Sequence, residues 1–329
     1  MIRYFRCTVK PFYTTCLGTP NSARQRDSHI EMLAQAMDDR HADPEARQWR
    51  LQWAIGIYAG GSPLTVAPRT QPDAPVLTAA DVTDLDAFGV ADPFFLQAQG
   101  RIYLFFEVLN RATDRGEIAY ATSSDGLDWT YGAVALREPF HLSYPFVFAH
   151  GGDFYMIPET RQAQAVRLYR ADRFPAGWRC VGELLTGPFA DSTLIFHEGR
   201  WWLFAERGLD ELRLFHSRDF TGGWVEHPAS PLWPGNRRYS RPGGRIVAAD
   251  GRLLRFAQDG WPTYGSRLHA FAIDALTPTA YAEHLCPESP ILAATGAGWN
   301  ALAMHHLDAL EVAPGKWLAA VDGASIGLA

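Results

Sequence analysis

The chain has 329 residues, of which 47% are hydrophobic, 13% aromatic and 20% charged. This composition supports a sizeable apolar core and excludes a disordered polypeptide. The formal net charge is −6 and the basic residues are dispersed, so the sequence offers no basic patch and we expect no nucleic-acid partner.

The sequence lacks the features typical of transmembrane segments, signal peptides and cysteine-based metal or disulfide sites. The sequence has no run of about eighteen apolar residues and no long apolar stretch near Met1, which predicts a cytoplasmic protein without a transmembrane segment. The four cysteines, at positions 7, 16, 180 and 286, lack Cys-x-x-Cys spacing. We therefore expect neither a structural zinc site nor a disulfide framework.

Residues 1–48 precede the repeat described below and are predicted to form an N-terminal extension. Ser28 and Glu31 have the spacing of a capping box, and apolar residues follow at Leu33, Ala34 and Met37. This pattern predicts a short helix within the extension.

One hairpin pattern recurs along the rest of the chain. Each copy has a β-rich run, a turn that contains glycine, and a second β-rich run that ends at an acidic residue. The copies span residues 91–107, 143–159, 190–206, 240–259 and 304–322. They begin roughly 50 residues apart, which is the length of a four-stranded propeller blade. The sequence therefore predicts an all-β fold, a five-bladed β-propeller over residues 49–329.

The fifth copy lacks room for a complete blade, because the chain ends soon after its second run. A ring needs its last blade closed. The run Trp53–Tyr58, which precedes the first hairpin, is predicted to supply an outer strand there, so that the two ends of the propeller meet in blade five.

The repeat places acidic residues at corresponding positions in successive hairpins. Residues equidistant from a turn face each other, so we expect Asp92 to face Glu107, and Asp191 to face Glu206. The inner strands of a propeller are parallel from blade to blade, which brings their starting residues to one mouth of the channel. The set expected there is Asp92, Asp191, Arg241 and His306, with Glu107, Glu159, Glu206, Asp259 and Asp322 around or behind them.

A ring of carboxyl groups is unfavourable unless the structure uses it. Repulsion and burial raise some carboxyl pKa values, and such shifts let one carboxyl act as a general acid while its neighbour acts as a base or nucleophile. For any single residue, capping a turn is an equally good explanation. The signal lies in the whole ring, which predicts a functional site in the central channel.

Other residues are weaker candidates for ligand contacts. Arg241 could recognise an anionic group on a sugar, or merely neutralise the ring. His305 and His306 could contact a ligand or hold a channel cation such as calcium, or be core residues; no other cofactor is expected. Tyr144, at the start of the second hairpin, and Trp299, in a loop like Trp261, complete the predicted sugar contacts.

The chain also resembles a known family in several stretches. It is similar to the N-terminal domain of the glucosamine inositolphosphorylceramide transferase family over roughly residues 50–323. The matching stretches are Trp53–Tyr58, Val82–Asp84, Val90–Phe94, Tyr103–Glu107, His141–Phe146, Met156–Glu159, Val166–Arg170 and Arg241–Gly244. That domain is similar to the five-bladed arabinanase, xylosidase and invertase type of glycosidase, which implies five blades and sugar chemistry.

The resemblance also implies catalytic roles, with one departure. Asp92 and Asp191 match the glycosidase aspartates of blades one and three, but Arg241 opens blade four, where those enzymes have their acidic glutamate. We therefore expect a glycoside hydrolase or transglycosidase with Asp92 as base or nucleophile, Asp191 orienting the substrate and tuning pKa values, and Glu206 as the acid. Glu107 and Glu159 are the other residues in reach for the acid.

The alternative is a non-catalytic carbohydrate-recognition module that supports a polysaccharide or glycolipid pathway. In both cases the partner is a glycan or a sugar-containing small molecule. Glycosyl transfer from a nucleotide sugar is not implied, because the matching stretches do not include the transferase module of the family.

Overall fold

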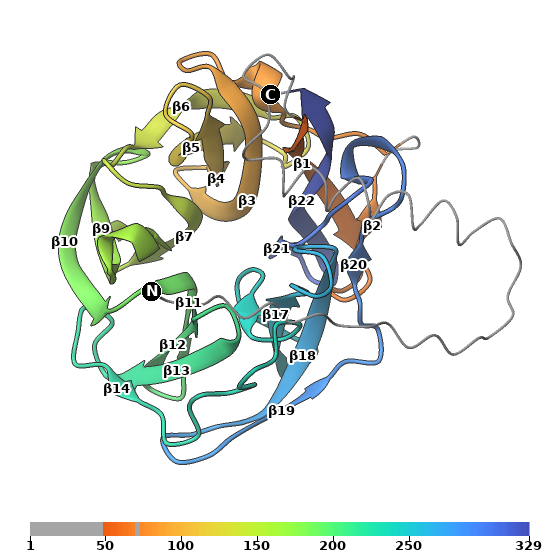
Figure 1. Ribbon diagram of the computed structural model, residues 1–329. Coiled ribbons are helices and arrows are strands. Elements are labelled where there is room, and N and C mark those ends of the chain that lie inside the picture. The colour runs from red at the N-terminus through yellow and green to blue at the C-terminus, as the bar shows by residue number, and fades with distance from the viewer. Residues whose placement is uncertain (1–48, 70–72, 329) are drawn as a thin grey trace, which may run out of the picture. The chain divides into compact units, whose positions relative to one another are not determined.

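Five antiparallel sheets surround a central axis in the part of the chain that the structure describes (Figure 1). The computed structural model describes residues 49–69 and 73–328, and residues Leu51–Gly327 form one unit. The predicted extension, residues 1–48, and its helix lie outside the described residues. The predicted five-bladed β-propeller is confirmed.

Each blade is an antiparallel sheet that begins with its innermost strand. Blade one contains β3 (Ala87–Ala98), β4 (Arg101–Asn110), β5 (Arg115–Ser123) and β6 (Thr130–Leu136). Blade two contains β7 (Ser143–His150), β8 (Asp153–Glu159), β9 (Ala165–Arg173) and β10 (Ala176–Thr186). Blade three contains β11 (Phe189–His197), β12 (Arg200–Arg207), β13 (Glu211–Ser217) and β14 (Val225–Glu226).

Blade four has a broken first strand. It contains β15 (Arg241–Pro242), β16 (Val247–Ala249), β17 (Arg252–Gln258), β18 (Arg267–Leu276), β19 (Tyr281–Leu285) and β20 (Leu292–Ala293). Three short 3-10 turns lie outside the sheets: Ala79–Asp81, Arg161–Ala163 and Gly298–Asn300. Within the described ranges, no helix is long and apolar enough to cross a membrane.

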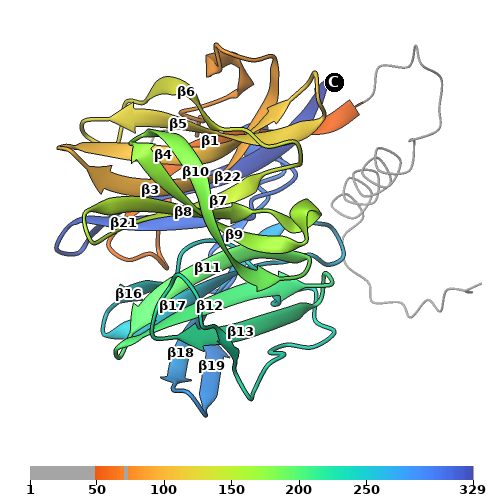
Figure 2. The same cartoon turned by 90° about the vertical axis from the view of Figure 1, so that its left-hand side faces the viewer.

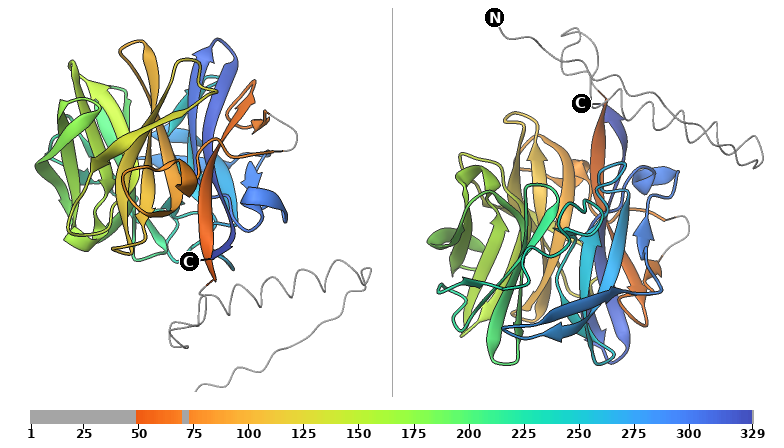
Figure 3. Two further views of the ribbon diagram at one scale, coloured as in Figure 1. Left: turned by 90° about the horizontal axis from the view of Figure 1, so that it is seen from above. Right: turned by 60° about the horizontal axis from the view of Figure 1, so that its bottom comes forward.

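Blade five is built from both ends of the propeller. It contains β21 (Leu307–Ala313), β22 (Lys316–Leu328), β1 (Trp49–Gly60) and β2 (Ala67–Pro68). The hydrogen-bonded order is β21, β22, β1 and β2, so the predicted contribution of Trp53–Tyr58 to the last blade is confirmed. The views in Figures 2 and 3 show β1 beside β22 between β3 and the strands of blade four.

Apolar side chains fill the spaces between neighbouring blades. In β4, Ile102–Phe106 is buried without interruption, as expected for a strand covered on both faces. Phe105 packs edge-on against Trp178 of blade two, with ring centroids 5.6 Å apart. The exclusion of this aromatic surface from water stabilises the contact between blades.

The first strands of blades one to three share a β-bulge. Asp92, Tyr144 and Asp191 have left-handed φ angles of 51°, 45° and 48°, and the register is irregular after the residue that precedes each of them. As a result Ala91 lies opposite Glu107. The predicted pairing of Asp92 with Glu107, and of Asp191 with Glu206, is therefore wrong by one residue, because a bulge adds an unpaired residue and turns its side chain.

The segment between β15 and β16 ties blade four to the four other blades. Gly244 N–H donates to the hydroxyl of Tyr144 (2.8 Å), and Gly244 O accepts from Thr193 Oγ1 (3.2 Å). Arg245 Nε pairs with Asp308 of β21 (3.0 Å), and its Nη2 donates to the carbonyl oxygens of Phe95 (3.2 Å) and Val147 (3.0 Å). Contacts to every other blade place this segment on the axis of the ring.

Replacing Gly244 with Ala should destabilise the propeller strongly. Gly244 has a φ of 141°, and a Cβ there would collide with the carbonyl oxygen of Leu307. We expect the free energy of unfolding to fall by about 2 kcal/mol or more. Gly182→Ala is the matched control, since the space around Gly182 is open. In denaturant titrations, a Gly244→Ala protein as stable as Gly182→Ala would contradict this role.

Candidate functional site

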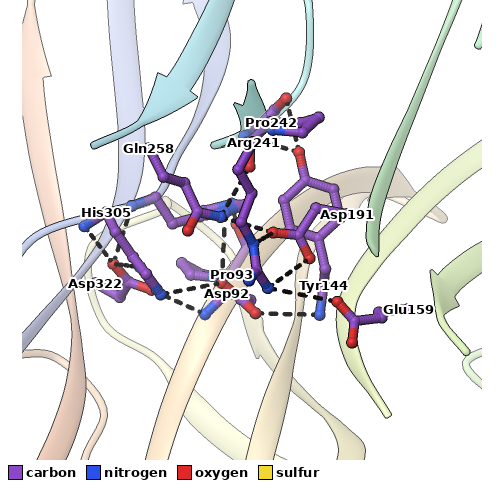
Figure 4. Close-up of polar contacts among 12 residues, drawn as sticks. Asp92, Pro93, Tyr144, Glu159, Asp191, Arg241, Pro242, Gln258, His305 and Asp322 are labelled. Carbon is purple, nitrogen blue, oxygen red and sulfur yellow. Dashed lines mark hydrogen bonds and ion pairs between the residues drawn. The ribbon is translucent and has the colours of Figure 1, made fainter. Parts of the chain in front are cut away.

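The site lies where the inner strands of the blades begin. Arg241, at the start of β15, lies among acidic side chains from blades one to three (Figure 4). In that view its guanidinium lies between the carboxyl groups of Asp92 and Glu159. The predicted convergence of these acidic side chains and Arg241 is thus visible in the structure.

Arg241 is held by three carboxyl groups. Its Nε lies 2.6 Å from Asp191 Oδ2 and 3.8 Å from Glu206 Oε2, and its Nη2 lies 3.4 Å from Glu159 Oε2. The ring of Tyr264 lies under the guanidinium, 5.4 Å from Cζ to centroid, in a cation–π contact. The guanidinium of Arg241 therefore already contacts carboxyl groups of the protein itself.

Asp191 and Glu206 are almost entirely buried around this cation. The exposed fraction of the side chain is 1% for Asp191 and 3% for Glu206. Asp191 Oδ2 also accepts a hydrogen bond of 2.7 Å from Gln258 Nε2. Their position indicates that these two acids hold Arg241 in place.

Asp92 has one engaged and one unpartnered oxygen. Its Oδ2 accepts from the backbone N–H of Tyr144 (3.2 Å), and its own N–H donates to Asp322 Oδ2 (3.1 Å). Its Oδ1 has no hydrogen-bond partner among the described residues; it lies 3.9 Å from His305 Nε2 and 3.7 Å from His306 Nδ1. The bulge thus aims a buried carboxylate oxygen at two imidazole rings.

The two histidines are fixed by their other ring nitrogens. His305 Nδ1 lies 2.8 Å from Asp322 Oδ1, and the ring stacks on Trp53 at 4.2 Å between centroids. His306 Nε2 lies 3.0 Å from the carbonyl oxygen of Pro93. These partners set the tautomer of each neutral ring and orient it.

A cation could be held beside Asp92. Asp92, His305 and Asp322 offer ligand atoms that lie within 4.8 Å of one another. Asp322 already accepts hydrogen bonds from the N–H groups of Asp92, His305 and His306 as well as from the His305 ring, so the chain's own donors account for its position. The expected channel cation, such as calcium, stays a prediction.

Burial raises the pKa of several acids in the ring. Burial, with repulsion from Asp191 and Asp322 and an opposing effect of His305, raises the pKa of Asp92 to about 7. Burial and the neighbouring Asp191 raise the pKa of Glu159 to about 8. Burial also raises the pKa of Glu206 and holds that of Glu107 well above its usual range. Both Asp92 and Glu159 therefore change charge near neutral pH.

Glu107 lies beside a neutral histidine. His141 Nδ1 accepts a hydrogen bond of 2.9 Å from the N–H of Gly116, so the proton of the neutral ring is on Nε2, which lies 3.3 Å from Glu107 Oε1. Burial and the charge of Arg241 lower the pKa of His141. Glu107 thus has a polar partner at the edge of the site.

Three predicted contacts lie apart from Arg241 or face away from it. Asp259 pairs with His269 and Arg238, both at 3.3 Å. Trp299 lines a separate pocket of about 630 Å³ beside β1 and β2, also lined by Asp73 and Ile291. The hydroxyl of Tyr144 points to Gly244, and its backbone N–H donates to Asp92.

Sequence comparison places the chain in a family. The family described as glucosamine inositolphosphorylceramide transferase 1, N-terminal, matches residues 48–324. The chain belongs to this family.

Curated relatives of this family member come from plants. The glucosamine inositolphosphorylceramide transferase 1 of Oryza sativa subsp. japonica is 37% identical over 295 residues, covering 82% of this chain and 40% of that protein. The protein of the same name from Arabidopsis thaliana is 35% identical, covering 82% of this chain and 39% of that protein. The chain therefore spans about two fifths of the length of these relatives.

Solved structures share the fold of this transferase N-terminal domain. The catalytic domain of the Coprinopsis cinerea GH62 α-L-arabinofuranosidase aligns with a TM-score of 0.55 and 12% identity, covering 85% of this chain and 99% of that one. A structure from the GH130 family of mannoside phosphorylases, which contains glycoside hydrolases that target β-1,2-mannosidic linkages, aligns with a TM-score of 0.56 and 11% identity, covering 80% of this chain and 93% of that one. At this identity the likeness shows the fold alone.

Some residues of the site escaped the sequence analysis. Gln258 was passed over in favour of Asp259, although it is the sixth residue after Arg252, the same spacing that separates Arg101 from Glu107. This equal count from the turn was a usable signal. Tyr264 lies in a loop outside the repeat and gave no signal.

The free energy of unfolding should fall as the pH rises from about 6.5 to 8. A carboxyl group with a raised pKa keeps in the folded state a proton that the unfolded chain has released, so its stabilising contribution is lost as the pH rises through the folded pKa. Asp92 and Glu159 act in this way, and so does His305, whose pKa Asp322 raises against the effect of burial. Burial lowers the pKa of His306 to about 4, so His306 acts below this range.

Denaturant titrations of wild type and Asp92→Asn at several pH values check this dependence. Each such group contributes a slope of up to about 1.4 kcal/mol per pH unit. The Asn variant should show a shallower slope, because it lacks one titrating group. The same slope in both proteins would contradict the raised pKa of Asp92.

Proposed function

We propose that the chain acts on a glycosidic bond, as a glycoside hydrolase or transglycosidase, through Asp92 and Glu159. The family description names a glucosamine transferase, and the two structural neighbours include enzymes named for arabinofuranoside and mannoside substrates. These names support a sugar-containing ligand. The observation that carries the proposal is the pair of mostly buried carboxyl groups with raised pKa values, Asp92 and Glu159, whose pKa values are both lowered by the nearby Arg241.

Accessibility favours Glu159 over Glu206 as the acid. The side chain of Glu159 is 11% exposed and that of Asp92 is 8% exposed, against 3% for Glu206. A general acid must reach the leaving oxygen of the substrate. Glu206, which the sequence suggested for this role, is better suited to holding Arg241.

The charged neighbours of the two carboxyl groups assign their roles. Glu159, with a pKa of about 8, keeps its proton at neutral pH and would donate it to the leaving group. Asp92 lies near His305 and Arg241, which favour its ionised form, and would act as base or nucleophile. Asp191 would keep the Arg241 cation between them, which favours ionised Asp92.

A second candidate function is sugar recognition without catalysis. The contacts of Arg241 with Asp191, Glu159 and Glu206 occupy much of the acidic ring, and the relatives named as transferases are more than twice as long as the matched region. In this case the propeller would hold the sugar part of a substrate for another part of such a protein.

Two substitutions separate these functions. Asp92→Asn should lower kcat/KM by about 10²- to 10⁴-fold on every substrate, because the base or nucleophile is lost. Glu159→Gln should lower activity on natural glycans to a similar extent but retain activity on nitrophenyl glycosides, whose leaving group needs no acid. The measurement is hydrolysis of nitrophenyl α-L-arabinofuranoside, β-mannoside and glucosaminide, beside the matching oligosaccharides.

Glu211→Gln is the matched control, since Glu211 pairs with Arg213 on β13, outside the acidic ring. It should keep wild-type activity. Full activity in Asp92→Asn would remove Asp92 from catalysis. Wild-type protein that binds these sugars yet never cleaves or transfers them would favour the recognition function.

A further inference from the structure

The loop between β17 and β18 is firmly anchored beside the acidic ring. It follows Gln258, whose side chain contacts Asp191. Asp259 Oδ1 accepts from the N–H of Trp261 (2.9 Å), and the N–H of Gly265 donates to Asp259 O (3.0 Å). Asp259 also pairs with Arg238 and His269. These bonds give the loop, residues 259–266, a fixed base.

The second half of the loop packs on the site. The ring of Tyr264 contacts the guanidinium of Arg241 and lies edge-on to His305, with centroids 5.3 Å apart. A Cβ on Gly265 would lie 3.0 Å from the His305 ring, so the backbone approaches this histidine closely. The loop is therefore part of the wall of the site.

The first half of the loop presents an exposed tryptophan. Trp261 is 52% exposed, more than any other tryptophan whose side chain is described. Tyr264 lies three positions further along the chain, so the two Cα atoms are within about 11 Å of each other. Because the Trp261 side chain stays exposed to water in the free protein, it contributes little hydrophobic free energy to folding. Loops held by a rigid scaffold carry many binding residues, and tryptophan combines an apolar face with a polar N–H that suits a partly hydrated contact.

We propose that Trp261 is a stacking platform for a second sugar ring, so that the ligand is an oligosaccharide of at least two units. The flat indole face suits the apolar face of a sugar ring, and its N–H can bond a hydroxyl. One ring of the ligand would lie at Asp92 and Glu159, and the next would lie on Trp261. This inference rests on the proposed function, because it requires a sugar at the acidic ring.

Calorimetric titration of the full chain with paired probes tests the inference. The probes are β-1,2-mannobiose with mannose, arabinobiose with arabinose, and glucosaminyl-inositol with glucosamine. For the two-unit probe that the wild type binds, Trp261→Ala should lower the affinity by about three- to tenfold. The affinity for the corresponding single sugar should stay unchanged. Trp261→Phe should restore most of the affinity, because it keeps an aromatic face.

Phe196→Ala is the matched control. Phe196 is 57% exposed and lies near the β11–β12 turn, which closes the opposite end of its hairpin from Asp191 and Glu206; its removal should leave binding unchanged. Equal affinity of Trp261→Ala and wild type for the two-unit probe would overturn the inference and leave the proposed function standing. Failure of wild type to bind any probe would overturn the proposed function and this inference together.

Discussion

The ion pairs of one arginine make the acidic centre of this propeller possible. Arg241 contacts Asp191, Glu159 and Glu206 within 4 Å in a region largely closed to water. Carboxylates buried without a cation lose several kcal/mol each to desolvation, and removal of one partner from a buried pair costs about 3–5 kcal/mol. The arginine at the start of blade four therefore compensates the charge that the other blades contribute to the axis.

Left-handed backbone conformations also help to position the groups of the site. The left-handed bulge residues Asp92, Tyr144 and Asp191 turn side chains or backbone N–H groups toward one point, and such conformations persist only where the surrounding structure enforces them. At Tyr144 the Gly243–Arg245 segment contributes, because Gly244 N–H donates to the Tyr144 hydroxyl; Asp92 is held by Asp322, and Asp191 by Arg241 and Gln258. The first strand of blade four is interrupted between β15 and β16. The residues of this interruption contact the inner strands of the other blades.

The fold could be predicted well from the sequence because the repeat depends on the number of residues between successive hairpins. This spacing does not depend on the identity of individual side chains. The sequence predicted the members of the site less well. A bulge adds a residue without leaving a mark in the sequence, so the pairing of Asp92 with Glu107 came out one residue wrong. Trp299 was expected at the sugar site but packs against Gly56 and Gly323 in blade five, since an aromatic residue in a loop carries no information about the direction of its ring.

The same arginine also lowers the pKa of both Asp92 and Glu159. Asp92 lies near His305 and Arg241, and both favour its ionised form. Glu159 has Asp191 as its strongest charged neighbour, which favours its protonated form more than Arg241 opposes it. Both carboxyl groups are buried, and they differ in the charged neighbours that act on them. Loss of Arg241 would raise the pKa values of both Asp92 and Glu159. The pH range in which Asp92 is ionised and Glu159 is protonated would then move to higher pH. Arg241, the residue that departs from the glycosidase pattern, would thus be the one that brings this range toward neutral pH.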